Sequence, residues 1–305
     1  MIDLESSNHK TFYRVSGVIF IGILTLIIIS NGKMGNDAGM WSYIGRVWVE
    51  HDMPPYKDAV ENKTPGIFIL YAISHYFFGI NFFFPRLIGG FTILLTGFIL
   101  HRIGKSIHSN QAGILSAIIF IFSMLWEVTN KGYVEHTETF MVFFTTLAFY
   151  NLSKNHRKTN LLNYFTNGFL IGMAIVFKQI ALVTLAGLGL FVIYFFRKDS
   201  SIILKLLAYI TLGVLFANFL SVIPLFLSGV SIIEYINGAW FILFNEGSSY
   251  PRSFWRVPKF LDIFFGSKLV IFYTIMVFIF FKFKTLKNIH FFKILVAWLL
   301  IAFFA

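Results

Sequence analysis

The sequence contains no cysteine among its 305 residues, and only 13% of its residues are charged. The lack of cysteine excludes structural disulfides and metal sites built from thiolates. The shortage of charge accompanies an apolar fraction of 57%, which includes 40 phenylalanines. A soluble domain of this length could not bury so much apolar surface. The composition therefore excludes an ordinary soluble protein.

Apolar runs of membrane-spanning length recur along the chain, which predicts an all-α, polytopic integral membrane protein. No small-x-small cleavage site follows the first run, "VSGVIFIGILTLIIIS" (15–30), so we interpret it as an uncleaved span. No internal repeat or low-complexity linker divides residues 1–305, and we predict a single transmembrane domain. The sequence stops inside an apolar run, so we expect the natural chain to continue beyond 305. The predicted spans, about nine, are 15–30, 85–101, 112–126, 138–152, 164–177, 180–196, 203–227, 268–281 and 291–305.

The stretch "PGIFILYAISHYFFGI" (65–80) is short for a span, and the basic residues decide whether it crosses. If it lies along the interface and the N-terminus is cytoplasmic, twelve basic residues after 85 fall inside and seven outside. If it crossed, this bias would reverse. We therefore predict an interfacial helix there, within an outer loop at 31–84, and a second long outer loop at 228–267. The inside residues are Arg102, Lys105, Lys154, Arg157, Lys158, Arg197, Lys198, Lys205, Lys282, Lys284, Lys287 and Lys293. The outside residues are Arg86, Lys131, Lys178, Arg252, Arg256, Lys259 and Lys268.

The same topology explains the formal charge of +11 without a nucleic-acid partner, because basic residues at the cytoplasmic helix ends suit an anionic leaflet. The acids lie on the other side. Only Asp3, Glu5 and Asp199 fall inside, and acids contribute little to orientation. Their one-sidedness indicates a working outer face. The outer acids are Asp37, Glu50, Asp52, Asp58, Glu61, Glu127, Glu135, Glu138, Glu234, Glu246 and Asp262.

Two residues of the first outer loop are candidates for chemistry. Asp37, in "GNDAGMWSYIG", either caps a helix or holds a carboxylate at the membrane surface to take a proton from an acceptor. Lys63, in "ENKTPG", either snorkels toward headgroups or binds the phosphate of a lipid-linked substrate.

A second polar region, "NKGYVEHTETF" (130–140), opens the predicted span at 138–152. Glu135 and Glu138 are three residues apart and would share a helix face, with His136 between them. They are either acids that a helix N-terminus tolerates or members of an active site. Lys178 interrupts two apolar runs, and either ends a span or reaches a substrate phosphate.

The order of these features resembles the GT-C glycosyltransferases that use polyprenyl-phosphate sugars. The likeness is to the branch with the protein O-mannosyltransferases and the aminoarabinose transferases of lipid A. It covers roughly residues 10–200. The matching features are Asp37 soon after the first span, the spacing Tyr56-x6-Lys63-x-Pro65, "FPRLIGGFTILLTGFILHRIGK", "YVEHTETFMVFFTTLAFYNL" and "GFLIGMAIVFKQ". In place of the adjacent Asp-Glu pair of the protein mannosyltransferases, Ala38 follows Asp37 here.

The resemblance implies a GT-C helical bundle that moves a sugar from a polyprenyl-phosphate donor to a glycan, lipid or protein acceptor, with inversion. Asp37 would be the general base, and Glu138 or Glu135 the second acid, the choice between them being open. Lys63 and Lys178, with Arg86, would neutralise the leaving phosphate, and Tyr56 and His136 would contact substrate. The family leaves metal open; any Mg²⁺ or Mn²⁺ would bind at Asp37 and Glu138.

Two other functions remain open. A multispan lipid or sugar transporter or flippase would keep charges near the bilayer midplane and often show two related halves, neither of which the sequence has. A non-catalytic membrane assembly subunit would tolerate loss of Asp37 and Lys63. We expect a plasma (inner) membrane protein with a cytoplasmic N-terminus and a periplasmic or extracellular active face.

Overall fold

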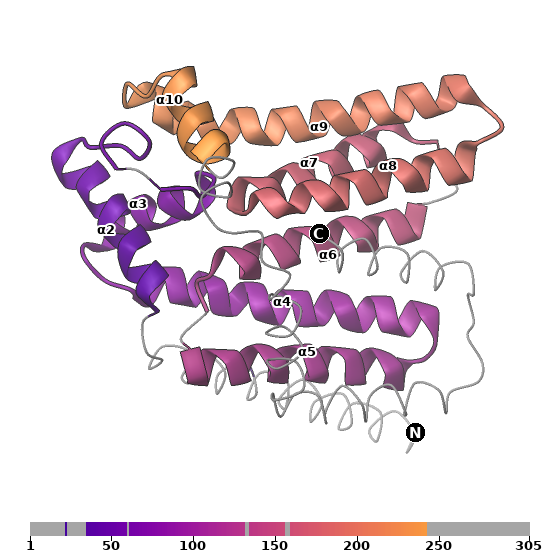
Figure 1. Ribbon diagram of the computed structural model, residues 1–305. Helices are drawn as coiled ribbons and strands as arrows, with labels where there is room; N and C mark the ends of the chain where they lie inside the picture. The colour runs from indigo at the N-terminus through magenta and orange to yellow at the C-terminus, as the bar shows by residue number, and fades with distance from the viewer. Residues whose placement is uncertain (1–21, 23–34, 60, 132–133, 156–158, 243–305) are drawn as a thin grey trace, which may run out of the picture.

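The computed structural model describes residues 22, 35–59, 61–131, 134–155 and 159–242 (Figure 1). Most of these residues are helical, and within them the only strand-like pairing is a single bridge between Pro55 and Ala59. The predicted spans at 15–30, 268–281 and 291–305 lie outside the described residues. The predicted all-α class is confirmed.

Six helices run side by side and form the bundle: α4 (Phe83–Ile107), α5 (Asn110–Lys131), α6 (Thr137–Asn155), α7 (Leu161–Phe177), α8 (Leu182–Phe196) and α9 (Ser200–Leu227). They match the apolar runs because such runs favour helices whose backbone groups are satisfied internally. Polar caps set the starts of two of them. Asn160 accepts from the Leu162 amide before α7, and Asp199 accepts from the Ile202 amide before α9.

Three helical segments within the described residues are long and apolar enough to cross a membrane, namely Phe83–Ile107, Gln179–Phe196 and Ser200–Leu227. Gly66–Phe78, Asn110–Met124 and Leu161–Phe177 are apolar but shorter. The chain is therefore a membrane protein by its helices.

Glycines bring α7 and α9 into backbone contact. A Cβ on Gly168 would lie 2.0 Å from the Ile210 carbonyl oxygen, and one on Gly213 would lie 2.2 Å from the Phe165 carbonyl oxygen. Side chains larger than hydrogen cannot occupy these points, so the two helices pack through their backbones. This contact fixes the first half of α7, the helix whose C-terminal end carries Lys178.

The helix α3 (Gly66–Phe78) lies across one end of the bundle and does not run through it (Figure 1). Its first residue touches the last turn of α7, since a Cβ on Gly66 would lie 2.7 Å from the Val176 carbonyl oxygen. Its last residue, Phe78, stacks on Phe84 at the start of α4, with ring centroids 4.7 Å apart. Both ends of α3 therefore meet the same end of the bundle, as the distribution of basic residues predicts for 65–80.

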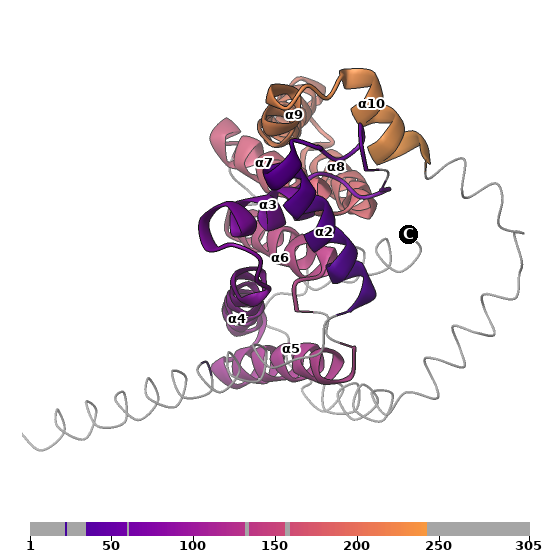
Figure 2. The same cartoon turned by 90° about the vertical axis from the view of Figure 1, so that its left-hand side faces the viewer.

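The helix α2 (Asn36–His51) packs on α3 at this end (Figure 2). A Cβ on Gly45 would lie 2.7 Å from the Tyr71 Cβ, so the two helices approach closely. Trp41, Phe68 and Tyr71 are fully buried between them. We call this part of the bundle, where α2 and α3 lie, the α2–α3 end.

The short helix α10 (Ile232–Ile236) and a π-helical turn, η2 (Asn237–Phe241), follow α9 at the α2–α3 end. Ser231 and Glu234 form a capping box that starts α10. The sequence predicts only a long loop here, because a five-residue helix is too short for periodicity to show. Residues 243–267 of that loop lie outside the described part.

Charge separates the two ends of the bundle. Within the described residues the opposite end carries Arg102, Lys105, Lys154, Arg197, Lys198 and Lys205 with one acid, Asp199. The other acids of the described part belong to segments at the α2–α3 end. This is the division expected of a membrane protein with basic helix ends on one side.

Candidate active site

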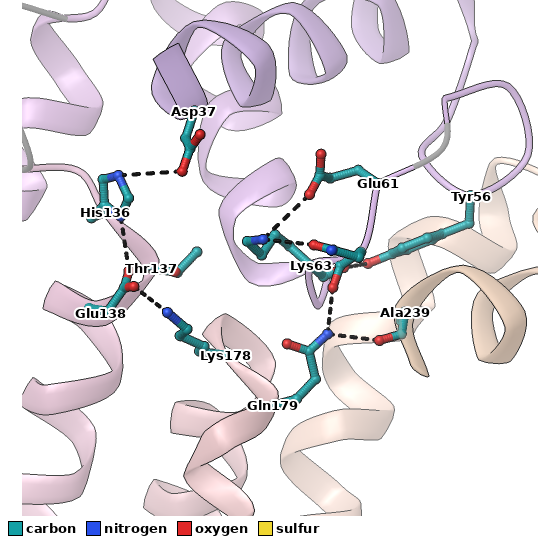
Figure 3. Close-up of polar contacts among 11 residues, drawn as sticks. Asp37, Tyr56, Glu61, Lys63, His136, Thr137, Glu138, Lys178, Gln179 and Ala239 are labelled. Carbon is teal, nitrogen blue, oxygen red and sulfur yellow. Dashed lines mark hydrogen bonds and ion pairs between the residues drawn. The ribbon is translucent and has the colours of Figure 1, made fainter. Parts of the chain in front are cut away.

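Four of the predicted residues form one chain of contacts at the α2–α3 end (Figure 3). Asp37 Oδ2 lies 3.9 Å from His136 Nε2, and His136 Nδ1 lies 2.9 Å from Glu138 Oε2. Lys178 Nζ donates a hydrogen bond to Glu138 Oε1. The sequence separates Asp37 from His136 and Glu138 from Lys178 by long stretches, and the fold brings them together.

Asp37 lies in the first turn of α2 and does not cap it. The N-cap residue is Gly35, and no side chain accepts a hydrogen bond there. The helix-cap alternative for Asp37 is therefore wrong, although its negative charge still suits the positive end of the helix dipole. Its side chain is 56% exposed, which leaves the carboxylate accessible to a substrate.

Glu138, in contrast, has both oxygens occupied. Oε1 accepts from Lys178, and Oε2 accepts from the Thr137 hydroxyl at 2.8 Å as well as facing His136. Such charge-assisted hydrogen bonds hold a carboxylate ionised and fixed in place. Glu138 is thus better suited to hold Lys178 and His136 than to collect a proton.

Lys178 takes its place from the end of α7. It is the C-cap residue of that helix and has an extended backbone, so the chain leaves the helix there and its side chain turns toward Glu138. The structure shows that Lys178 ends the helix and belongs to the polar cluster, and its contact with a substrate phosphate stays a prediction.

His136 is held between two elements. Its ring meets Trp41 of α2 edge to face, with centroids 5.0 Å apart, while its Nδ1 faces Glu138 of α6. The imidazole is therefore fixed between the carboxylates of Asp37 and Glu138.

Lys63 lies on the facing loop, between α2 and α3, and Figure 3 shows it across from the Asp37–Lys178 chain. Its Nζ donates to Asn62 Oδ1 at 2.7 Å and lies 3.5 Å from Glu61 Oε1. Three quarters of its side chain is covered, since 25% remains exposed. The neighbouring acid and amide hold the ammonium in one direction.

Tyr56 supports this loop from behind. Its hydroxyl donates to the Lys63 carbonyl oxygen at 2.5 Å, and its ring meets Phe68 and Tyr235 edge to face. Burial raises the pKa of the Tyr56 hydroxyl well above its usual value, with smaller contributions from Tyr235 and Glu61. Its φ of +73° is a left-handed conformation that costs a non-glycine residue on the order of 1–3 kcal/mol. The structure gives the Tyr56 hydroxyl a backbone partner, and the predicted contact of Tyr56 with substrate stays a prediction.

Arg86 and Glu135 form a separate, buried ion pair. Arg86 Nε lies 3.3 Å from Glu135 Oε1, and the two side chains are 10% and 0% exposed. Burial raises the pKa of the Glu135 carboxyl, and the Arg86 guanidinium opposes that rise without cancelling it. The pair fastens the connection before α6 to the start of α4, while Glu138, three residues on, faces His136 and Lys178.

A divalent cation does not fit the Asp37 and Glu138 side chains as they lie. Among the described residues, no three His, Asp or Glu side chains converge closely enough to hold a metal ion. Glu138 already faces the ammonium of Lys178, which would repel a second cation.

The sequence analysis missed Glu61, Asn62, Thr137 and Gln179 as members of this cluster. Glu61 and Asn62 stand directly before Lys63 in "ENKTPG", and Gln179 directly follows Lys178 in "VFKQIA". A polar residue beside a candidate charged residue or histidine at the edge of an apolar run is the signal that could have found them.

Residues 62–224, more than half of the chain, match the family described as dolichyl-phosphate-mannose-protein mannosyltransferase. The matched region contains Lys63, Arg86, His136, Glu138 and Lys178, while Asp37 precedes it. No curated protein and no solved structure is detectably similar to the chain. The predicted likeness to GT-C glycosyltransferases is thereby confirmed. The chain belongs to the dolichyl-phosphate-mannose-protein mannosyltransferase family and is a membrane glycosyltransferase of the mannosyltransferase type.

Proposed function

We propose that the α2–α3 end transfers a sugar from a polyprenyl-phosphate donor to a hydroxyl or amine of a glycan, lipid or protein acceptor. One observation carries this proposal. The accessible carboxylate of Asp37 lies at the same end of the bundle as two lysines, Lys63 and Lys178, within a family of lipid-phosphate-sugar enzymes.

In this mechanism Asp37 is the general base. It takes the proton from the acceptor as the acceptor oxygen or nitrogen attacks the anomeric carbon. The bond between that carbon and the phosphate oxygen breaks, and polyprenyl phosphate leaves with the electron pair. A single displacement of this kind inverts the anomeric configuration.

The two lysines stabilise the negative charge that develops on the leaving phosphate. Cations placed where charge develops are among the larger contributions to catalysis. Each lysine has a protein carboxylate beside it in the free protein, Glu61 for Lys63 and Glu138 for Lys178. A bound phosphate therefore meets two lysines that their carboxylate partners already orient. Binding does not have to order flexible lysine side chains.

The second acid in this proposal is Glu138, which fixes Lys178 and His136. Asp37 alone of these two carboxylates has room to accept a proton, because both oxygens of Glu138 accept hydrogen bonds. His136 lies between the carboxylates of Asp37 and Glu138 and sets the electrostatic environment of Asp37. Glu135 and Arg86 contribute by holding the backbone that precedes His136.

The orientation follows from the basic residues. With the opposite end cytoplasmic, the α2–α3 end faces the periplasm or the exterior of a plasma membrane, and α3 lies in the outer interface. The exposed aromatic residues at the C-terminal end of α3, Tyr76 (72% exposed), Phe77 (69%) and Phe78 (57%), suit such a location.

The test is sugar transfer in membrane vesicles that contain the full chain and labelled polyprenyl-phosphate sugars. We compare wild type with Asp37→Asn, and with Asp58→Asn as the matched control in the same loop, where the side chain is exposed and outside the cluster. We expect wild type and Asp58→Asn to release polyprenyl phosphate and Asp37→Asn to lose at least 100-fold. Full activity of Asp37→Asn would remove it as the base. Movement of labelled lipid across the bilayer without any transfer would favour a flippase instead.

A further inference from the structure

Gln179 joins two segments that lie far from it in the sequence. Its side-chain nitrogen Nε2 donates to the Asn62 carbonyl oxygen at 2.7 Å and to the Ala239 carbonyl oxygen at 2.7 Å. These partners are 117 and 60 residues away. Both hydrogens of one amide nitrogen are therefore used to connect the loop before α3 with η2, as Figure 3 shows.

The orientation of this amide is determined by its partners. If the carboxamide were flipped, its oxygen would point at two carbonyl oxygens, and neither could donate a hydrogen. Glutamate at this position would face the same conflict with a negative charge added. Only a side chain of this length that ends in a hydrogen-bond donor satisfies both carbonyl oxygens.

The contact to Asn62 controls where Lys63 lies. The Asn62 carbonyl is held by Gln179, and the Lys63 carbonyl is held by the Tyr56 hydroxyl, so the backbone at Lys63 is fixed by two successive groups. Gln179 is itself the covalent neighbour of Lys178. The residue beside one lysine therefore fixes the backbone beside the other.

The contact to Ala239 adds η2 to the segments that Gln179 connects. Ala239 is fully buried in η2, and a Cβ on the adjacent Gly238 would lie 2.6 Å from Tyr56 Cδ1. The π-helical turn thus packs directly on the residue that supports Lys63. Single π-helical turns are rare and occur frequently at functional sites.

We infer that Gln179 is a positioning residue that sets the spacing of Lys63 and Lys178 for the two-lysine grip on the donor phosphate. This inference rests on the proposed function for the role of the lysines. Gln179 itself does not touch the reacting atoms. It holds the Lys63 loop and η2 against the end of α7, so that both ammonium groups meet one phosphate.

The kinetic test uses Gln179→Met, which keeps the length of the side chain and removes both donors. We expect the KM for the polyprenyl-phosphate sugar to rise about tenfold and kcat to fall as well, because the lysines stabilise charge that develops in the transition state, with the KM for the acceptor within twofold of wild type. Asn167→Ala is the control, because it removes a buried amide that accepts from Asn151 inside the bundle. That variant destabilises the bundle and lowers the active fraction, so its apparent kcat falls while its donor KM stays unchanged.

A distance measurement tests whether Gln179 holds the Lys63 loop and η2 together, without relying on activity. The chain has no cysteine, so Lys57→Cys and Ile233→Cys, both at exposed positions, carry the only spin labels in full-length protein. We expect a narrow distribution of distances between these labels, which Gln179→Met broadens or lengthens.

An unchanged distribution in Gln179→Met overturns the inference, even if no sugar transfer is found and the proposed function fails. A broadened distribution with an unchanged donor KM in an active enzyme also overturns the inference, because the connection made by Gln179 would then be structural only. Transfer that depends on Asp37 but not on Gln179 leaves the proposed function standing without this inference.

Discussion

Replacing Arg86 with methionine removes one partner of a buried ion pair. Glu135 is fully buried, and its Oε2 has no hydrogen-bond partner within the described residues, so Arg86 is its main source of compensation. Breaking a buried pair by removing one side typically costs about 3–5 kcal/mol of unfolding free energy, because the other charge stays buried alone. We expect a loss in this range for Arg86→Met, measured by equilibrium unfolding in mixed detergent micelles.

The double variant Arg86→Met/Glu135→Met separates stability from chemistry. Replacing both partners of a buried pair with apolar residues of similar volume is often close to neutral. We expect the double variant to recover most of the stability and, with it, sugar transfer. Arg46→Met is the control, since it removes an exposed pair with Glu50 whose side chains are 44% and 36% exposed, and should cost about 0.5 kcal/mol or less.

The stability of Arg86→Met also depends on pH, with a definite sign. Burial raises the pKa of Glu135, and loss of Arg86 removes the main influence that lowers it. The folded variant therefore holds a proton that the unfolded chain releases. Its stability is greatest below the unfolded pKa of about 4.3 and falls as the pH rises through the higher folded pKa.

Two results would refute this reasoning. A cost below about 1 kcal/mol for Arg86→Met would mean that the pair is not buried as described. A double variant that is stable but inactive would mean that Arg86 meets the donor phosphate, as the family resemblance implies, and is not a structural partner of Glu135.

Two further predictions concern Lys178 and the helix contacts. Lys178→Gln should lower sugar transfer by about 100-fold, because the leaving phosphate loses a cation, while Lys205→Gln at the opposite end should stay within twofold; equal losses would contradict a role at the site. Gly168→Ala should destabilise the protein by about 1–3 kcal/mol in micelle unfolding, because its Cβ would lie 2.0 Å from the Ile210 carbonyl oxygen. Gly189→Ala is its control, since its Cβ would lie 3.9 Å from the nearest atom, Leu207 Cδ2; it should be neutral or gain up to about 1 kcal/mol from helix propensity.

The helices of the bundle were predictable because each apolar run is long enough for a helix and is bounded by polar residues. The run at 85–101, for example, is the central part of α4, which extends to Ile107 because amphipathic residues such as Arg102 and Lys105 continue the helix past the apolar part. The basic residues predicted that 65–80 stays on one side, and the structure places both ends of α3 at one end of the bundle; its location in the outer interface stays a prediction.

The contacts of the site were not predictable in the same way. Nothing local in the sequence shows that Arg86 meets Glu135, 49 residues later, or that Gln179 meets Asn62 and Ala239. Such pairs depend on which helix ends become neighbours, which is a property of the packing. Asp37 and Lys178 were found because a charge beside an apolar run is conspicuous, whereas the amide of Gln179 carries no charge and was overlooked.

The spread of these contacts along the chain has a consequence for synthesis at the membrane. Arg86 emerges before its partner Glu135, Lys63 before Gln179, and Gln179 before Ala239. Each of these earlier groups stays solvated at the interface until the later helix that carries its partner has been inserted beside it. Within the described residues, the two-lysine region is therefore among the last parts to become ordered, and it cannot be complete before about residue 239 has left the ribosome and its segment has docked. A pause in insertion before that point would leave a membrane-embedded bundle that is helical yet has no assembled site.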